Sequence, residues 1–168
     1  MKYIFGLGLP RTCTNSLGSA LYLMGINGEC KCILNNFRNK REKDDNSKEY
    51  KYIIYNDAYQ DLDTLLHDDK IYDNKYILTM RNDESWKQSI QNFDKKELVE
   101  ELNTLNITEY MEKIKKIFIE KDCIDNLCII NIFEEEYEDL WGKLYDFLEL
   151  THDEDMIESE FPNINLNE

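Results

Sequence analysis

The chain has 168 residues, of which 42% are hydrophobic and 12% aromatic, which is enough for one domain over residues 1–168. This composition argues against intrinsic disorder, and no stretch approaches the roughly 20 apolar residues of a membrane-spanning helix. The N-terminus has neither the charged start nor the small-residue cleavage site of a signal peptide. We therefore expect a cytoplasmic protein without a membrane partner.

The net charge of −15 comes entirely from the second half of the chain. Residues 1–93 contain 13 Lys and Arg against 13 Asp and Glu, whereas residues 94–168 contain 7 against 22. An acidic surface repels nucleic acid, so we expect no nucleic-acid partner. A small anion can still bind in the neutral half, because exposed charges are screened beyond about 8–10 Å.

The five cysteines are an odd number without the pattern of a disulfide framework. The Cys30-Lys31-Cys32 pair has no histidine near it in the sequence, since the two histidines are His67 and His152. We expect reduced thiols and no metal site.

Residues 3–9 are an apolar run that predicts a buried strand, and a Pro-Arg-Thr-Cys-Thr-Asn-Ser turn follows at residues 10–16. A helical pattern comes next. Its expected core positions are Leu17, Ala20, Leu21, Leu23 and Met24. The first N–H groups of such a helix lack partners within it, and its dipole favours negative charge there. Strand, turn and helix together therefore predict an anion site.

The side chains of this turn favour the same interpretation. Arg11 carries a planar cation suited to phosphate or sulfate, and Thr12, Thr14 and Ser16 add hydroxyl donors. No Asp or Glu occurs in residues 1–28 of a chain that is otherwise rich in them. The turn therefore predicts a loop of the phosphate-binding type.

Residues 35–49 are polar and predict a mobile loop. This loop is either a solvated surface or a lid that brings cations to an anionic ligand. The cations are Arg38, Lys40, Arg41 and Lys43. Residues 52–55 then predict a short strand that ends close to Asp57, and residues 59–66 predict a helix.

Strands and helices alternate in the rest of the chain. The apolar runs at residues 75–80 and 127–133 predict buried strands. Helices are expected at residues 84–92, 95–105, 108–121 and 137–150, with an apolar stripe at Ile114, Ile117 and Phe118. Residues 151–168 are expected to form a C-terminal tail.

This alternation predicts an α/β fold, a three-layer sandwich with a central parallel sheet covered on both faces. Ligands bind at the carboxyl ends of the strands in such folds. The anion loop, Asp57 and Arg81 each follow a predicted strand, so we expect all three to face one crevice.

Arg81 and Ser89 form a second candidate site. Asn82 or Asp83 can cap the helix that follows Arg81, and Ser89 lies one to two turns into that helix. A guanidinium and a hydroxyl at this place predict a site for a second phosphate group.

Together these motifs resemble those of the sulfotransferases, specifically a short cytosolic-type branch whose loop is often written G-L-P-R-T-G-T-T-S. Residues 8–16 of this chain read G-L-P-R-T-C-T-N-S. The family's second block is R-D-P-x-x-W-x-x-S after an apolar strand. Residues 81–89 are similar to it, with the same spacing from Arg81 to Trp86 and Ser89. Residues 56–58 look like the family's N-D-x-P region, and residues 161–165 are similar to its F-P-x-x-N.

The resemblance implies a P-loop NTPase-like fold and the donor 3′-phosphoadenosine 5′-phosphosulfate. The 3′-phosphate is then expected at Arg81 and Ser89, and the 5′-phosphosulfate at the loop. The loop residues concerned are Arg11, Thr12, Cys13, Thr14, Asn15 and Ser16. The family transfers the sulfuryl group in line, without a metal, to a hydroxyl or amine. The sequence does not identify this acceptor, a small molecule or a protein, or the oligomeric state.

Two residues are the candidates for catalysis. Arg11 is expected to stabilise the charge that develops on the bridging oxygen as the donor's S–O bond breaks. Asp57 is the candidate base for the acceptor proton, with His67 as the alternative.

Two alternatives stay open. Cys13 stands where the family's loop has glycine, and a side chain there is costly if the position requires a positive φ. A catalytically silent relative that binds the nucleotide or a protein partner is therefore one alternative. A P-loop nucleotide kinase is the other, although such enzymes use Gly-Lys-Ser/Thr where this chain has Cys13-Thr14-Asn15.

Overall fold

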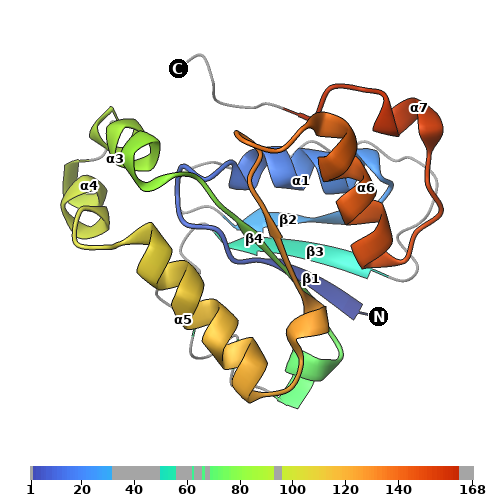
Figure 1. Ribbon diagram of the computed structural model, residues 1–168, viewed down its shortest axis with the longest axis horizontal. Coiled ribbons are helices and arrows are strands. Elements are labelled where there is room, and N and C mark those ends of the chain that lie inside the picture. Colours follow the sequence, from blue (N-terminus) through green and yellow to red (C-terminus); the bar gives the residue numbers. More distant parts are fainter. Residues whose placement is uncertain are drawn as a thin grey trace.

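The computed structural model describes residues 2–31, 50–55, 62, 66, 69–92 and 96–162. Its centre is a five-stranded sheet in the order β2-β3-β1-β4-β5, in which every pair of neighbouring strands is parallel (Figure 1). The strands are β1 (Lys2–Gly6), β2 (Asn27–Lys31), β3 (Tyr50–Tyr55), β4 (Lys75–Thr79) and β5 (Leu127–Ile130). The predicted parallel α/β fold is thus confirmed.

Among the described residues, helices connect β1 to β2 and β4 to β5, and two more helices follow β5. The α-helices are α1 (Thr14–Leu23), α3 (Asp83–Gln91), α4 (Lys96–Leu102), α5 (Ile107–Glu120), α6 (Tyr137–Leu148) and α7 (Glu154–Ile157). Short 3₁₀ turns occur at η1 (Asp69–Tyr72) and η2 (Ile124–Asn126). None of the helices in this part of the chain is long and apolar enough to cross a membrane.

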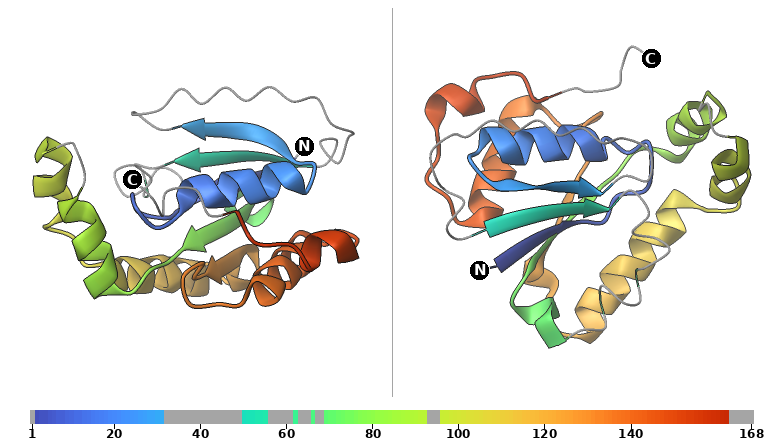
Figure 2. Two further views of the ribbon diagram at one scale, coloured as in Figure 1. Left: turned by 90° about the horizontal axis from the view of Figure 1, so that it is seen from above. Right: turned by 180° about the vertical axis from the view of Figure 1, so that it is seen from behind.

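Two apolar clusters cover opposite faces of the sheet and make the fold three-layered. One cluster joins α1 and α6 to the sheet, and the other joins α3, α4 and α5 to the opposite face. Strand β4 shows the alternation, since Ile77 faces the first cluster while Tyr76 and Leu78 face the second. Figure 2 shows α1 and α5 on the two sides of the sheet.

The predicted core of α1 is correct at all positions except Leu23. Leu17, Ala20, Leu21 and Met24 are buried, whereas the side chain of Leu23 is 50% exposed. The buried positions follow the i, i+3, i+4, i+7 spacing of one helical face, and residue 23 lies off that stripe.

The predicted C-terminal tail packs onto the domain as far as residue 162. Phe161 is buried, with its ring centroid 4.7 Å from that of Trp141, and Trp141 Nε1 donates a hydrogen bond to the Ser159 carbonyl at 3.1 Å. The predicted loop at residues 35–49 lies outside the described residues. Of the predicted helix at residues 59–66, Leu62 and Leu66 are described, and both are helical and buried.

Gly8, just after β1, sits where two chain segments approach closely. A Cβ added to Gly8 would lie 1.9 Å from Thr79 Oγ1 and 2.6 Å from Thr12 Oγ1. We expect Gly8→Ala to lower the free energy of unfolding by about 3 kcal/mol, because both hydroxyls are buried and must shift. Urea denaturation measures this change.

Gly142 in α6 is the matched control, because nothing lies within 4 Å of a Cβ added there. Gly142→Ala is expected to raise stability by about 0.5–1 kcal/mol through helix propensity. Equal changes in the free energy of unfolding for the two substitutions would contradict the expectation that a Cβ at Gly8 clashes with the threonine hydroxyls.

Candidate anion-binding site

The candidate site lies where β1 and β4 end, side by side at the centre of the sheet. The ladder continues one residue beyond each strand, since Leu7 N donates to Ile77 O and Met80 N donates to Ile130 O, both at 2.8 Å. The chain leaves β1 through α1 on one face and leaves β4 through α3, α4 and α5 on the other. Such a reversal between neighbouring strands is where α/β folds bind ligands.

The turn between β1 and α1 is fixed by hydrogen bonds that its carbonyl groups accept from side chains of α3 and α5. Tyr110 Oη on α5 donates to Leu7 O at 2.7 Å, and Trp86 Nε1 on α3 donates to Pro10 O at 2.9 Å. Trp86 is completely buried and packs in the core beside the turn. Because C=O and N–H point in opposite directions in a trans peptide, this bond directs the Arg11 N–H away from the core.

Thr12 is used inside the turn rather than at its surface. Its hydroxyl is fully buried and donates to Leu9 O at 2.7 Å, and its backbone N–H donates to the same oxygen at 3.2 Å. Since that hydroxyl has only one proton, Thr79 donates the bond of 2.8 Å that joins the two threonine hydroxyls. The Thr12 hydroxyl, which was expected to face an anion, therefore stabilises the turn instead.

Cys13 occupies a left-handed backbone conformation, with φ 64° and ψ 34°, and Arg11 has φ 69°. The position that carries glycine in the sulfotransferase loop thus requires a positive φ here. The thiol is 8% exposed and belongs to the cluster around α1 and α6. Burial raises the pKa of Cys13, although a hydrogen bond with Ser16 and the charges of Arg81 and Arg11 oppose this shift. At neutral pH the thiol is protonated.

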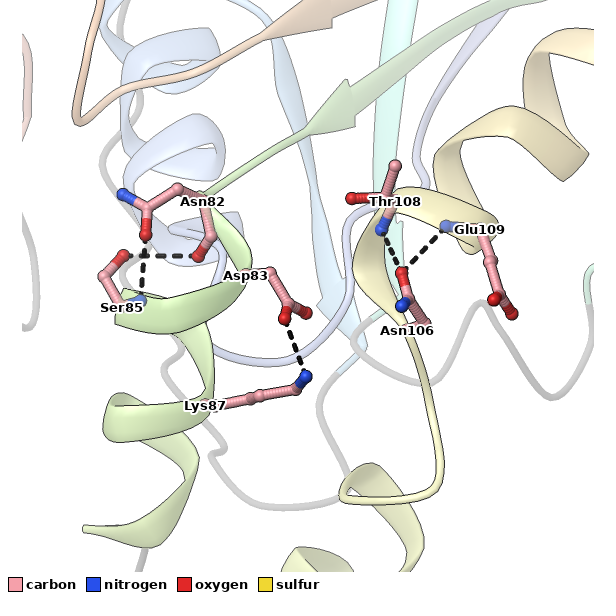
Figure 3. Close-up of polar contacts among 7 residues, drawn as sticks. All are labelled: Asn82, Asp83, Ser85, Lys87, Asn106, Thr108 and Glu109. Atoms are coloured by element: carbon pink, nitrogen blue, oxygen red, sulfur yellow. Dashed lines mark hydrogen bonds and ion pairs between the residues drawn. The ribbon is translucent and has the colours of Figure 1, made fainter.

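The N-terminus of α1 differs from those of α3 and α5. Asn82, one of the two caps predicted for α3, accepts the Ser85 N–H at 2.9 Å, and Asn106 accepts the N–H groups of Thr108 and Glu109 (Figure 3). Both helices also carry acidic residues in their first turn. In contrast, α1 has no acidic residue there, and the side chain of its N-cap, Cys13, does not cap a backbone N–H of the helix. This end of α1 keeps its positive potential.

Three further loop residues predicted to contact the donor begin α1. Thr14 and Ser16 are buried, and Asn15 is half-buried. Ser16 is also the hydrogen-bond partner of the Cys13 thiol. Asp57 and the alternative base His67 lie outside the described residues, so their predicted roles stay predictions.

Two arginines meet at the end of the sheet, one from each strand. Arg81 Nη1 donates to the backbone oxygen of Arg11 at 3.5 Å. Ser89 Oγ accepts a hydrogen bond from Arg11 Nε at 3.0 Å, so this hydroxyl lies against Arg11. Arg81 thus lies beside the loop, as predicted, and the binding of a phosphate by Arg81 together with Ser89 stays a prediction.

The hydroxyl that lies against Arg81 belongs to Ser85, which the sequence analysis missed. Arg81 Nε donates to Ser85 Oγ at 2.9 Å. The available signal was the spacing, because Ser85 lies four residues after Arg81 and four before Ser89. Residues at i and i+4 share one helical face, so both hydroxyls of α3 face the strand ends.

Arg81 lies in a partly buried position beside another cation. Its guanidinium carbon is 4.1 Å from the centre of the Phe133 ring. Burial lowers the pKa of Arg81, and the charge of Arg11 adds to this shift. Within the described residues, no carboxylate forms an ion pair with Arg81. The local charge therefore favours an anion as a ligand.

Asp83 and Lys87, four residues apart on α3, form an ion pair of 2.6 Å (Figure 3). Asp83 Oδ1 is buried and has no hydrogen-bond partner among the residues that the structure describes. Among the side chains that the structure describes, no group of three or more His, Cys, Asp or Glu could hold a metal ion.

The strain at Cys13 can be measured by substitution. In a left-handed conformation a Cβ costs about 1 kcal/mol, so we expect Cys13→Gly to be more stable than Cys13→Ala by about this amount. Both variants lose the thiol and its contact with Ser16, and the comparison therefore isolates the backbone. Urea denaturation of the two variants tests this expectation, and a more stable alanine variant would contradict it.

No protein-family model matches this chain, and no curated protein matches it. The likeness to sulfotransferases is therefore carried by the motifs in the sequence.

Proposed function

We propose that the chain is a sulfotransferase that moves a sulfuryl group from 3′-phosphoadenosine 5′-phosphosulfate to a hydroxyl or amine. The observation that carries this proposal is the meeting of Arg11 and Arg81 at the ends of adjacent strands, with 3.5 Å between Arg81 Nη1 and the Arg11 carbonyl. Two arginines brought together at one edge of the sheet, with the charge of Arg11 acting on Arg81, suit a ligand with more than one anionic group.

The donor fits the two ends of this site in a definite order. Its 5′-phosphosulfate is assigned to the turn at residues 10–16, where Arg11 and the positive end of α1 lie. Its 3′-phosphate is assigned to Arg81, which leads from β4 into α3. The buried bonds of Trp86 and Tyr110 to the turn support this order, because they fix the backbone that would receive the phosphosulfate.

The transfer itself is a displacement at sulfur. The bond between sulfur and the bridging oxygen breaks, a bond from sulfur to the acceptor atom forms, and adenosine 3′,5′-bisphosphate leaves with the charge. Arg11 is proposed to stabilise that charge, and the Asp57 carboxylate is proposed to take the acceptor's proton. Bonding of Arg11 Nε to Ser89 supports this role for Arg11, because it limits the motion of the cation.

The residues of the loop argue against a magnesium nucleotide. Kinases of the P-loop class need a lysine and a magnesium-binding hydroxyl after the loop glycine, and this chain has Cys13-Thr14-Asn15 there. The residues after β4 are Met80 and Arg81, which supply no carboxylate for a metal.

A catalytically silent nucleotide-binding protein is the second candidate. The left-handed conformation of Cys13 favours it, because a side chain at this position makes the turn less stable than glycine would. Such a protein would bind adenosine 3′,5′-bisphosphate without transferring a sulfuryl group.

The assignment of Arg81 to the 3′-phosphate is tested with Arg81→Ala. We expect affinity for adenosine 3′,5′-bisphosphate to fall by about 10- to 100-fold, the range for loss of a hydrogen bond to a charged group. Affinity for adenosine 5′-phosphate, which lacks the 3′-phosphate, should change by less than about threefold. Isothermal titration calorimetry measures both values.

Lys115→Ala removes one positive charge from the exposed side of α5 and serves as the control. It is expected to leave both affinities unchanged. Equal losses of both nucleotides in Arg81→Ala would place Arg81 elsewhere in the site and contradict the proposed order.

A further inference from the structure

We infer that Ser85 is a positioning residue, which holds the guanidinium of Arg81 in the orientation that receives an anion. This inference rests on the proposed function for the identity of the anion. The structural observation behind it does not depend on that function. A connected set of contacts fixes the guanidinium of Arg81 at its edge, through Ser85, and at its face, through Phe133.

The first contact is on the edge of the guanidinium. Arg81 Nε donates to Ser85 Oγ at 2.9 Å, and Ser85 Oγ donates its only proton to Asn82 O at 3.3 Å. Since that proton is committed, the oxygen presents a lone pair to Arg81. The backbone of Ser85 is fixed as well, because its N–H donates to Asn82 Oδ1 at 2.9 Å.

The second contact is on the face of the guanidinium. The ring of Phe133 lies 4.1 Å from the guanidinium carbon, which is a favourable cation–π distance. Phe133 is held in turn, because its N–H donates to Asn131 Oδ1 at 3.2 Å.

The two contacts belong to one ring of residues. Glu134, the neighbour of Phe133, accepts a hydrogen bond of 3.2 Å from Asn82 Nδ2. The segment between β5 and α6 therefore holds both Arg81 and the cap residue that orients Ser85. Rotation of Arg81 would break its bond to Ser85 and its stacking on Phe133 together.

In this orientation the N–H groups of Arg81 that make no contact within the described residues can bind a ligand. A guanidinium has five N–H groups, and within the described residues two of them are used, one by Ser85 and one by the Arg11 carbonyl. The remaining three belong to Nη1 and Nη2, the pair that binds phosphate through two parallel hydrogen bonds. A guanidinium held in place loses less conformational entropy on binding than a mobile one.

The two serines of α3 are expected to affect the affinities for the two nucleotides differently. Ser85 acts on Arg81 and therefore on the 3′-phosphate, whereas Ser89 acts on Arg11 and therefore on the 5′ end. Ser85→Ala should lower affinity for adenosine 3′,5′-bisphosphate by roughly tenfold and leave adenosine 5′-phosphate within about twofold. Ser89→Ala should weaken both nucleotides by similar factors.

Nuclear magnetic resonance tests the positioning itself without a nucleotide. The Arg81 Nε–H signal is assigned by its disappearance in Arg81→Lys, and its exchange with solvent should be roughly tenfold faster in Ser85→Ala. Ser85→Thr keeps the hydroxyl and should restore both slow exchange and the nucleotide preference. Ser89→Ala should leave this signal unchanged.

The outcomes separate this inference from the proposed function. Unchanged Nε–H exchange in Ser85→Ala would overturn the inference, as would equal losses of both nucleotides. If the unsubstituted chain binds no adenosine 3′,5′-bisphosphate, the proposed function fails, and Nε–H exchange alone decides whether Ser85 holds Arg81.

Discussion

The candidate site depends on hydrogen bonds that the turn after β1 accepts from the opposite layer of the fold. Tyr110 and Trp86 come from α5 and α3, and each donates to a carbonyl of this turn from a buried position. A buried carbonyl without a donor costs about 1–3 kcal/mol, so the turn keeps its shape only while these helices are packed. The helical layer of α3 and α5, on the opposite face of the sheet from α1, thus determines the conformation of the loop between β1 and α1.

Helix α3 connects the core to both cations of the site. Trp86 fixes the turn, and Ser85 and Ser89, on either side of it in sequence, each accept a hydrogen bond from one arginine. Neutral hydroxyls bind guanidinium groups without cancelling their charge, whereas carboxylates would neutralise them. The two serines of the helix therefore orient both guanidinium groups without themselves neutralising either charge.

The sequence predicted those features that depend on local pattern. Buried strands, the apolar face of α1 and the cap at Asn82 follow from periodicity and from residue type next to a helix start. The pairing of each serine with its arginine did not follow, because it depends on the spacing between the ends of β1 and β4. The Thr12–Thr79 contact joins residues 67 positions apart, and no local pattern indicates it. The glycine of the sulfotransferase loop indicated that position 13 could require a positive φ, and Cys13 does have a positive φ.

The central claim is that Arg11 and Arg81 make one site for a nucleotide with phosphates at both ends of its ribose. Calorimetric titration of the unsubstituted chain with adenosine 3′,5′-bisphosphate, and separately with ATP and magnesium, tests this claim most directly. The account predicts binding of the bisphosphate that needs no metal, and much weaker binding of ATP whether or not magnesium is present. Tighter binding of ATP that requires magnesium would contradict it.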